Sequence, residues 1–141
     1  MSKVFGYPAF DQSGEMILTT YEGDYAAMLM DIRIYKMKAG ETRKFCRAGE
    51  EIAVLLLSGA VTLKCEGREH AAARRDVFTE GPWCVHASSG VEISVTAETE
   101  AEILVQCTKT KRNSPASSTA RRTPPGNTPV WANSAMWPSA R

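Results

Sequence analysis

Cys46, Glu51 and His86 are the side chains of this sequence whose types could together hold a divalent metal ion. Thiolate, carboxylate and imidazole are ordinary ligands of zinc and of neighbouring transition metals. The chain has only two histidines, and we expect the other, His70, on a solvated hairpin. Each of the three residues also has a purely structural explanation. Cys46 can pack in a pocket, Glu51 can lie at the top of a strand, and His86 can lie on a loop or strand edge. The sequence therefore assigns no metal ligand, no cofactor-binding residue and no catalytic residue.

Other chemistry-bearing patterns are weaker still. Glu50 and Glu51 are adjacent, and adjacent strand residues point to opposite faces, so they do not form a general acid and base pair. Arg74 and Arg75 could meet an anionic sugar acid, but a solvated charged turn explains them better. The sequence contains no phosphate-binding glycine loop and no Gly-x-Ser-x-Gly nucleophile motif.

The residues between these groups are typical of short strands. Alternation of apolar and polar residues, with glycine turns between the segments, predicts an all-β sandwich or small barrel without long helices. Ile52–Leu57 is continuously apolar, as in a strand buried on both faces, and Ser58-Gly59 is expected to turn the chain. We expect a bulge within 31–38. The other expected strand segments are 16–19, 25–30, 61–65, 77–78, 83–86, 91–95 and 101–107.

The composition changes sharply near Asn113. Residues 1–112 carry all 16 acidic and 14 of the 17 basic side chains, whereas residues 113–141 carry three arginines and no acidic residue. Of those last 29 residues, 15 are Ala, Ser or Pro. Such a segment cannot bury enough apolar area to offset the ordering entropy. We therefore expect one domain over 1–112 and a disordered tail over 113–141.

Charge and cysteine usage limit the function classes. The net charge of +1 demands neither nucleic acid nor an anionic membrane as a partner. The start of the chain has no apolar run of signal-peptide length. The expectation is a cytoplasmic protein whose cysteines are reduced and mostly buried, namely Cys46, Cys65, Cys84 and Cys107.

An ordered set of short segments resembles the N-terminal half of 5-deoxyglucuronate isomerase, an enzyme family of myo-inositol catabolism. The region that begins at Gly40 resembles the first conserved region of a cupin. In both, the glycine is followed by a loop, an acidic residue and an apolar strand. The larger set covers roughly residues 20–112 and consists of the segments 37–41, 57–59, 75–78 and 91–97. The resemblance implies a cupin-like jelly-roll domain.

The resemblance also implies an activity, namely the aldose–ketose isomerisation of 5-deoxyglucuronate to 5-dehydro-2-deoxygluconate. It implies a divalent metal held by the second cupin of a longer chain. In metal-binding cupins a His-x-His pair follows the glycine, and these positions here are Cys46 and Ala48. Glu51 and His86 lie near the other two ligand positions but out of register. We therefore expect no metal in this domain, and a divalent metal in the second cupin.

The tail admits a further interpretation as a frameshift. Synonymous codons for residues 113–125 can be chosen so that a shifted frame encodes Phe-Pro-Gly-Lys-Leu-Tyr-Arg-Pro-Glu-Asp-Thr-Pro, which resembles the linker after the first cupin of this family. The same shift over 129–137 permits a glycine-rich, arginine-containing segment that resembles the entry to the second cupin. On this hypothesis the chain is a truncated isomerase that is inactive alone, and a natural disordered tail is the alternative.

Two other functions remain open at this stage. One is a stand-alone, metal-free cupin that binds a sugar acid without converting it. The other is a fragment of the related 4-deoxyuronate isomerase of pectin breakdown. In each case we expect a sugar acid as the ligand and neither nucleic acid nor a membrane as a partner. The sequence does not decide whether the chain forms a homo-oligomer.

Overall fold

The structure, a computed structural model, describes residues 8–111 and the backbone of residues 117–120. This part of the chain consists of strands and one short 3-10 helix. Their bounds are β1 Glu15–Thr19, η1 Ala26–Met28, β2 Met30–Met37, β3 Thr42–Phe45, β4 Glu50–Cys65, β5 Arg68–Arg74, β6 Trp83–Ala87, β7 Ile93–Ala97, β8 Ala101–Lys109 and β9 Ser117–Ala120.

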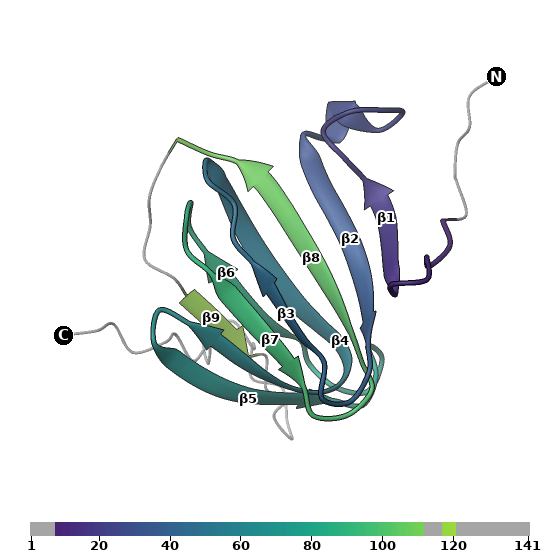
Figure 1. The fold of residues 1–141 in the computed structure, drawn as a ribbon, viewed down its shortest axis with the longest axis vertical. Helices are drawn as coiled ribbons and strands as arrows, with labels where there is room; N and C mark the ends of the chain where they lie inside the picture. The colour runs from purple at the N-terminus through teal and green to yellow at the C-terminus, as the bar shows by residue number, and fades with distance from the viewer. Residues whose placement is uncertain (1–7, 112–116, 121–141) are drawn as a thin grey trace.

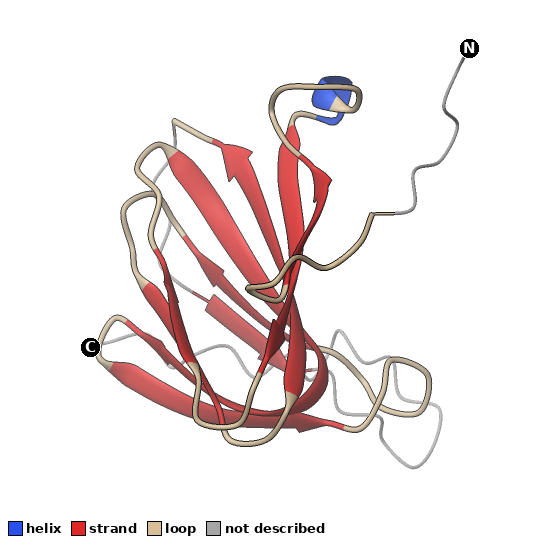
Figure 2. Ribbon diagram, turned by 45° about the vertical axis from the view of Figure 1, so that its right-hand side comes forward, coloured by secondary structure: helices blue, strands red, loops and turns tan. Residues whose placement is uncertain are grey.

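The strands form two antiparallel sheets that face each other (Figures 1 and 2). Sheet A has the order β1-β2-β8-β4-β6-β9. Sheet B has the order β3-β7-β4-β5. This arrangement is the cupin-like jelly roll that the sequence predicts, because strands distant in sequence pair within each sheet.

Strand β4 belongs to both sheets and connects them. Its first half pairs with β8 and β6 in sheet A, and its second half pairs with β7 and β5 in sheet B. Ser58-Gly59 is thus not the expected turn but the corner where one strand changes sheet. Gly59 has φ +96°, a conformation that glycine adopts without strain. The register with β8 also shifts between Leu56 and Ser58, which bends the strand at this point.

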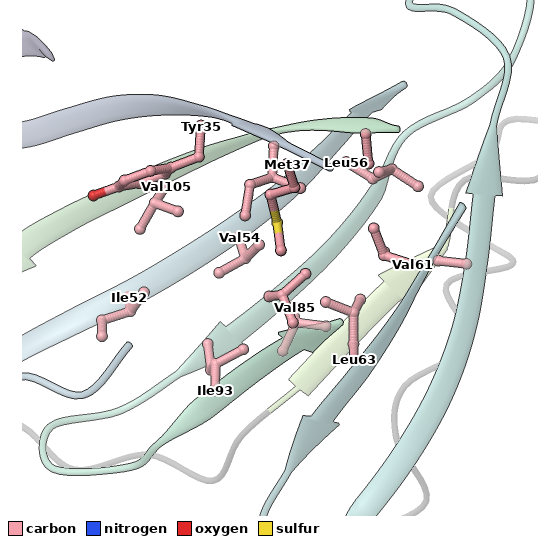
Figure 3. Packing of buried hydrophobic residues seen from close by; sticks show 14 of the residues in the cluster. Tyr35, Met37, Ile52, Val54, Leu56, Val61, Leu63, Val85, Ile93 and Val105 are labelled. Carbon is pink, nitrogen blue, oxygen red and sulfur yellow. The ribbon is translucent and has the colours of Figure 1, made fainter. Parts of the chain in front are cut away.

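The core lies between the two sheets and follows the strand alternation (Figure 3). Every second residue of β7, of β8 and of 52–56 and 61–65 in β4 is buried, because successive side chains of a strand point to opposite faces. The largest of the fully buried side chains are Ile52, Leu56, Leu63, Ile93 and Ile103. Their burial supplies the main driving force for the fold.

Three local predictions are wrong. Residues 25–30 do not form a strand, because a 3-10 turn ends at Leu29, whose left-handed φ of 58° redirects the chain into β2. Residues 77–78 lie in a loop. Strand β2 pairs with β8 without interruption from Met30 to Met37, and the irregularity lies in β1 between Ile17 and Thr19. The alternation of apolar residues changes phase between Ile34 and Tyr35 because both faces of β2 carry apolar side chains.

The segment 113–141 is described only in part. Ser117–Ala120 forms β9, which pairs with β6, so these four residues adopt structure within the tail that we expected to be disordered. Residues 113–116 and 121–141 lie outside the described residues, and the prediction for them stays a prediction. Within residues 8–111 and 117–120, no helix is long and apolar enough to cross a membrane.

Candidate functional site

Glu51 and His86 do lie together, but on the outer face of sheet A. Glu51 Oε2 and His86 Nε2 are 3.4 Å apart. Their neighbours Ile52 and Ala87 are cross-strand partners and are both 0% exposed. Because strand residues alternate between faces, Glu51 and His86 point away from the core. The inward-facing positions belong to Ile52 and Ala87, each one residue further along its strand. Glu51 and His86 therefore cannot place a metal inside the barrel.

Cys46 does not join this pair. It is exposed on the loop between β3 and β4, and its Sγ lies 3.4 Å from the carbonyl oxygen of Gly90. Ala48 is exposed on the same loop. Among the described residues, no group of three or more His, Cys, Asp and Glu side chains could hold a metal ion. The residues of this domain therefore do not fit the metal that the cupin family implies.

Arg47, which no sequence argument singled out, makes contacts at one end of the core. Its Nη1 lies 3.6 Å from Asp31 Oδ2 and 3.5 Å from Glu50 Oε1. Asp31 is buried at the start of β2, opposite Cys107 in the adjacent strand. Glu50 thus contacts Arg47 whereas Glu51 contacts His86, which confirms that the two adjacent carboxylates diverge.

A second arginine completes this charged cluster. Arg33 donates to both carboxylate oxygens of Asp31, at 2.8 and 3.0 Å, and its Nη1 donates to Glu15 at 3.2 Å. These hydrogen bonds raise the pKa of the Arg33 guanidinium further above its ordinary value. Burial, and to a smaller extent the nearby Glu50 carboxylate, raises the pKa of the Tyr21 hydroxyl, whose buried oxygen has no hydrogen-bond partner.

We name Glu15, Asp31, Arg33, Arg47 and Glu50 the end cluster. Three carboxylates face two guanidiniums, so the cluster carries no surplus positive charge for an anion. These paired, partly buried charges favour one arrangement of the strands that carry them. Glu50 Oε1 is 3.5 Å from Arg47 Nη1 and has no hydrogen-bond partner. The end cluster therefore closes this end of the core.

A cleft of about 540 Å³ lies elsewhere, between residues 10–14 and the ends of β2 and β8. This volume is within the range of small-molecule sites. Lys36 and Lys38 line it together with four acidic residues, Asp11, Glu41, Glu100 and Glu102. The Lys36 ammonium lies 4.3 Å from the centre of the Phe10 ring and 3.7 Å from Glu102. Sequence reasoning missed this cleft because its lining comes from segments that only the fold brings together.

Of the remaining candidates, Arg74 and His70 are structural residues. Arg74 is only 7% exposed, so the prediction of a solvated turn is wrong for it. Its guanidinium donates to three backbone carbonyl oxygens, the closest being Leu56 O at 2.8 Å. Arg75 is exposed. His70 is half-buried against the Trp83 ring, with ring centres 4.6 Å apart, and is thus not the solvated residue that we expected.

The comparison with family models decides the assignment of the chain. The model of the KduI/IolB family matches residues 6–127. The chain belongs to the KduI/IolB family. Membership agrees with the resemblance found in the sequence. No curated protein matches the chain at a significant level.

Solved structures show the same fold at low sequence identity. An IolB-like protein of Salmonella typhimurium has 20% identity and a TM-score of 0.60, over 64% of this chain and 36% of that chain. A predicted oxalate decarboxylase of Thermotoga maritima has 16% identity and a TM-score of 0.56, over 68% and 79% of the two chains. The protein YlbA of E. coli has 13% identity and a TM-score of 0.61, over 82% and 48%. This KduI/IolB family chain thus spans little more than a third of the IolB-like protein.

Proposed function

We propose that this chain is the N-terminal half of a 5-deoxyglucuronate isomerase of inositol catabolism, and that it does not catalyse the reaction alone. The reaction is the aldose–ketose isomerisation of 5-deoxyglucuronate to 5-dehydro-2-deoxygluconate in the cytoplasm. The observation that carries this proposal is the family match over residues 6–127 combined with an interior that has no ligand set.

The chemistry of the inward-facing side chains supports the lack of activity. Isomerisation moves a hydrogen between adjacent carbons, which requires a group that removes and returns a proton. It also requires a cation or hydrogen-bond donors at the oxygen that becomes negative. The cluster of buried hydrophobic core residues is apolar apart from the hydroxyl of Tyr35 and the thiols of Cys65 and Cys107, and burial raises the pKa of all three groups. The buried charged side chains are held by partners: Asp31 pairs with Arg33 and Arg47, and Arg74 donates to backbone carbonyl oxygens.

On this proposal the catalytic groups belong to a second cupin domain. We propose that the gene encodes this domain in another reading frame, which is lost after about codon 113. This half provides a structural domain against which the metal-bearing half packs. Its share of the IolB-like protein, 36% of that chain, agrees with such a partial product. The related 4-deoxyuronate isomerase would use the same two-domain plan, and the genes beside this one would distinguish inositol from pectin catabolism.

A sugar-acid binding protein without turnover is the second candidate, and the cleft beside Lys36 and Lys38 favours it. Its volume suits a monosaccharide, and Lys38 could receive the carboxylate of a sugar acid. Titration calorimetry of 5-deoxyglucuronate into the metal-free 141-residue chain tests this candidate. Saturable binding that Lys38→Gln weakens would support it, provided that Lys64→Gln, an exposed lysine outside the cleft, leaves binding unchanged.

Activity assays of two proteins test the leading proposal. The 141-residue chain with added Mn²⁺, Zn²⁺ or Ni²⁺ should convert 5-deoxyglucuronate no faster than the buffer does. The product of the gene with its frame restored before codon 113 should convert it and lose activity with a chelator. Metal-dependent turnover by the 141-residue chain itself would contradict the proposal.

A further inference from the structure

The outer face of sheet A carries a row of apolar side chains that runs across the strands from β1 to β6. Cross-strand pairing places one residue of each strand in this row. In β2, β8, β4 and β6 the residue that follows the row member is buried in the core, so the row itself points outward. We name it the outer row, and its five half-buried members are Met16, Ile34, Leu104, Leu55 and Cys84.

No strand or helix among residues 8–111 and 117–120 packs across the outer row. Every described strand belongs to sheet A or to sheet B, and sheet B packs against the inner face of sheet A (Figures 1 and 2). The 3-10 helix η1 lies at the ends of β1 and β2 (Figure 1). The row is therefore open on its outer side in this part of the chain.

The outer face of sheet B has the opposite character. Its cross-strand rows consist of polar residues, namely Thr42, Thr96 and Thr62 in one row and Lys44, Ser94 and Lys64 in the next. A sheet face in contact with water normally carries such residues. The apolar outer row thus has the composition of a covered face, and the face of sheet B has that of a solvated one.

The end of this chain starts at the edge of the outer row. Strand β9 pairs with β6, and Thr119 is the cross-strand partner of Cys84, the last member of the row. The 21 residues after Ala120 include two tryptophans, Trp131 and Trp137. The 11 residues up to Trp131 can span about 36 Å when extended, whereas sheet A is about 24 Å wide from β9 to β1. The first tryptophan can therefore reach every strand of the row.

Charge and composition favour this segment as the cover. Residues 1–112 carry 14 basic and 16 acidic side chains, a net charge of −2, whereas residues 121–141 carry three arginines and no acidic residue. A segment of this composition does not fold alone, but it can become ordered against a surface that is already formed. Each tryptophan that docks buries about 150–250 Å².

We propose that residues 121–141 fold back over the outer face of sheet A and dock Trp131 and Trp137 on the outer row. The inference goes beyond the proposed function and does not depend on it, because it concerns the chain in the frame in which it is translated. The docked segment covers the apolar face of this domain without a second domain or a second copy. The 141-residue chain should accordingly be a monomer.

Melting temperatures of variants of the 141-residue chain test the docking. Trp131→Ser together with Trp137→Ser should lower the melting temperature by about 4 °C or more, because the outer row loses its cover. Leu104→Ala should lower it in the parent chain and by clearly less in the chain without the two tryptophans, because groups in contact are coupled. Phe78→Ser is the matched control, since Phe78 is an apolar side chain that is 93% exposed outside sheet A. Its effect should be the same with and without the tryptophans.

Three results would overturn the proposal. They are an unchanged melting temperature after loss of both tryptophans, an equal effect of Leu104→Ala in the two chains, and sedimentation as a dimer that Leu104→Ala dissociates. In the last case a second copy covers the row. An inactive frame-restored enzyme would contradict the proposed function without altering these measurements, so the two failures are distinguishable.

Discussion

Burial determines the chemistry of the cysteines. The four cysteines are free thiols, and Cys65 and Cys107 lie in the core at 3% and 1% exposure. Burial raises the pKa of both thiols from an ordinary value of 9.0 to about 11. A thiol is a nucleophile only as the thiolate, so these two residues should be inert in the folded protein.

Thiol titration checks this expectation. At pH 8 the exposed Cys46 should react quickly with a disulfide reagent, whereas Cys65 and Cys107 should react only on unfolding. The unfolded thiols ionise near pH 9 and the folded ones near pH 11, so the free energy of unfolding should fall by more than about 1 kcal/mol as pH rises between these values. Cys65→Ala with Cys107→Ala should reduce that fall. Equal reactivity of all the cysteines in the folded protein would contradict the account.

At this scale the sequence could predict residue types but not the faces on which they lie. Counting from Gly40 put the carboxylate position one or two residues from Glu51, and the histidine of the second motif was expected near His86 but out of register. Only the pairing of Ile52 with Ala87 shows that these neighbours occupy the inward positions. Arg47 and Glu50 are three residues apart, but Asp31 lies in a separate segment, and no local pattern indicates the contact of Arg47 with it.

Strand β4 is the element that unites the two sheets, and its bend depends on Gly59. A Cβ atom added there would lie 2.7 Å from Ala101 Cα and 2.8 Å from Ala101 Cβ. The φ of +96° would be strained for any other residue as well. The tight contact and the backbone conformation together require glycine at this corner.

Substitution at the corner should therefore be severe. Gly59→Ala should lower the free energy of unfolding by about 3 kcal/mol or more, from the strained φ and the clash with the β7–β8 turn. Gly40→Ala is the control, because Gly40 also has a positive φ but nothing lies within 4 Å of the added Cβ. Its cost should be about 1 kcal/mol. Urea unfolding of both variants measures the difference, and equal costs would show that the close approach to Ala101 is unimportant.

At the element scale the apolar pattern predicted the all-β class but not the strand limits. Residues 52–57 are continuously apolar because both faces of sheet A carry such residues. Ile52, Val54 and Leu56 fill the core, while Leu55 belongs to a cross-strand row on the outer face. That row consists of Met16, Ile34, Leu104, Leu55 and Cys84. The run ends at Ser58-Gly59, but a corner within one strand and a turn between two strands give the same local break in the pattern.

For the whole molecule, the central claim is that this chain is one half of a two-domain sugar isomerase. The family match extends to residue 127, so the given frame still matches the family over part of the segment that the frameshift hypothesis takes as out of frame. The missing ligand set among the described residues is expected of a domain whose catalytic groups lie elsewhere. A domain boundary at residue 112 remains a prediction, because most of the segment beyond it lies outside the described residues.

Resequencing the genomic DNA from about codon 105 to a few hundred bases beyond the stop codon tests this claim most directly. We predict that one added or missing base near codon 113 restores a frame encoding a second cupin with clustered histidines and a glutamate. A confirmed frame with no cupin-like sequence downstream would contradict the account. The single-domain binding protein would then become the leading explanation.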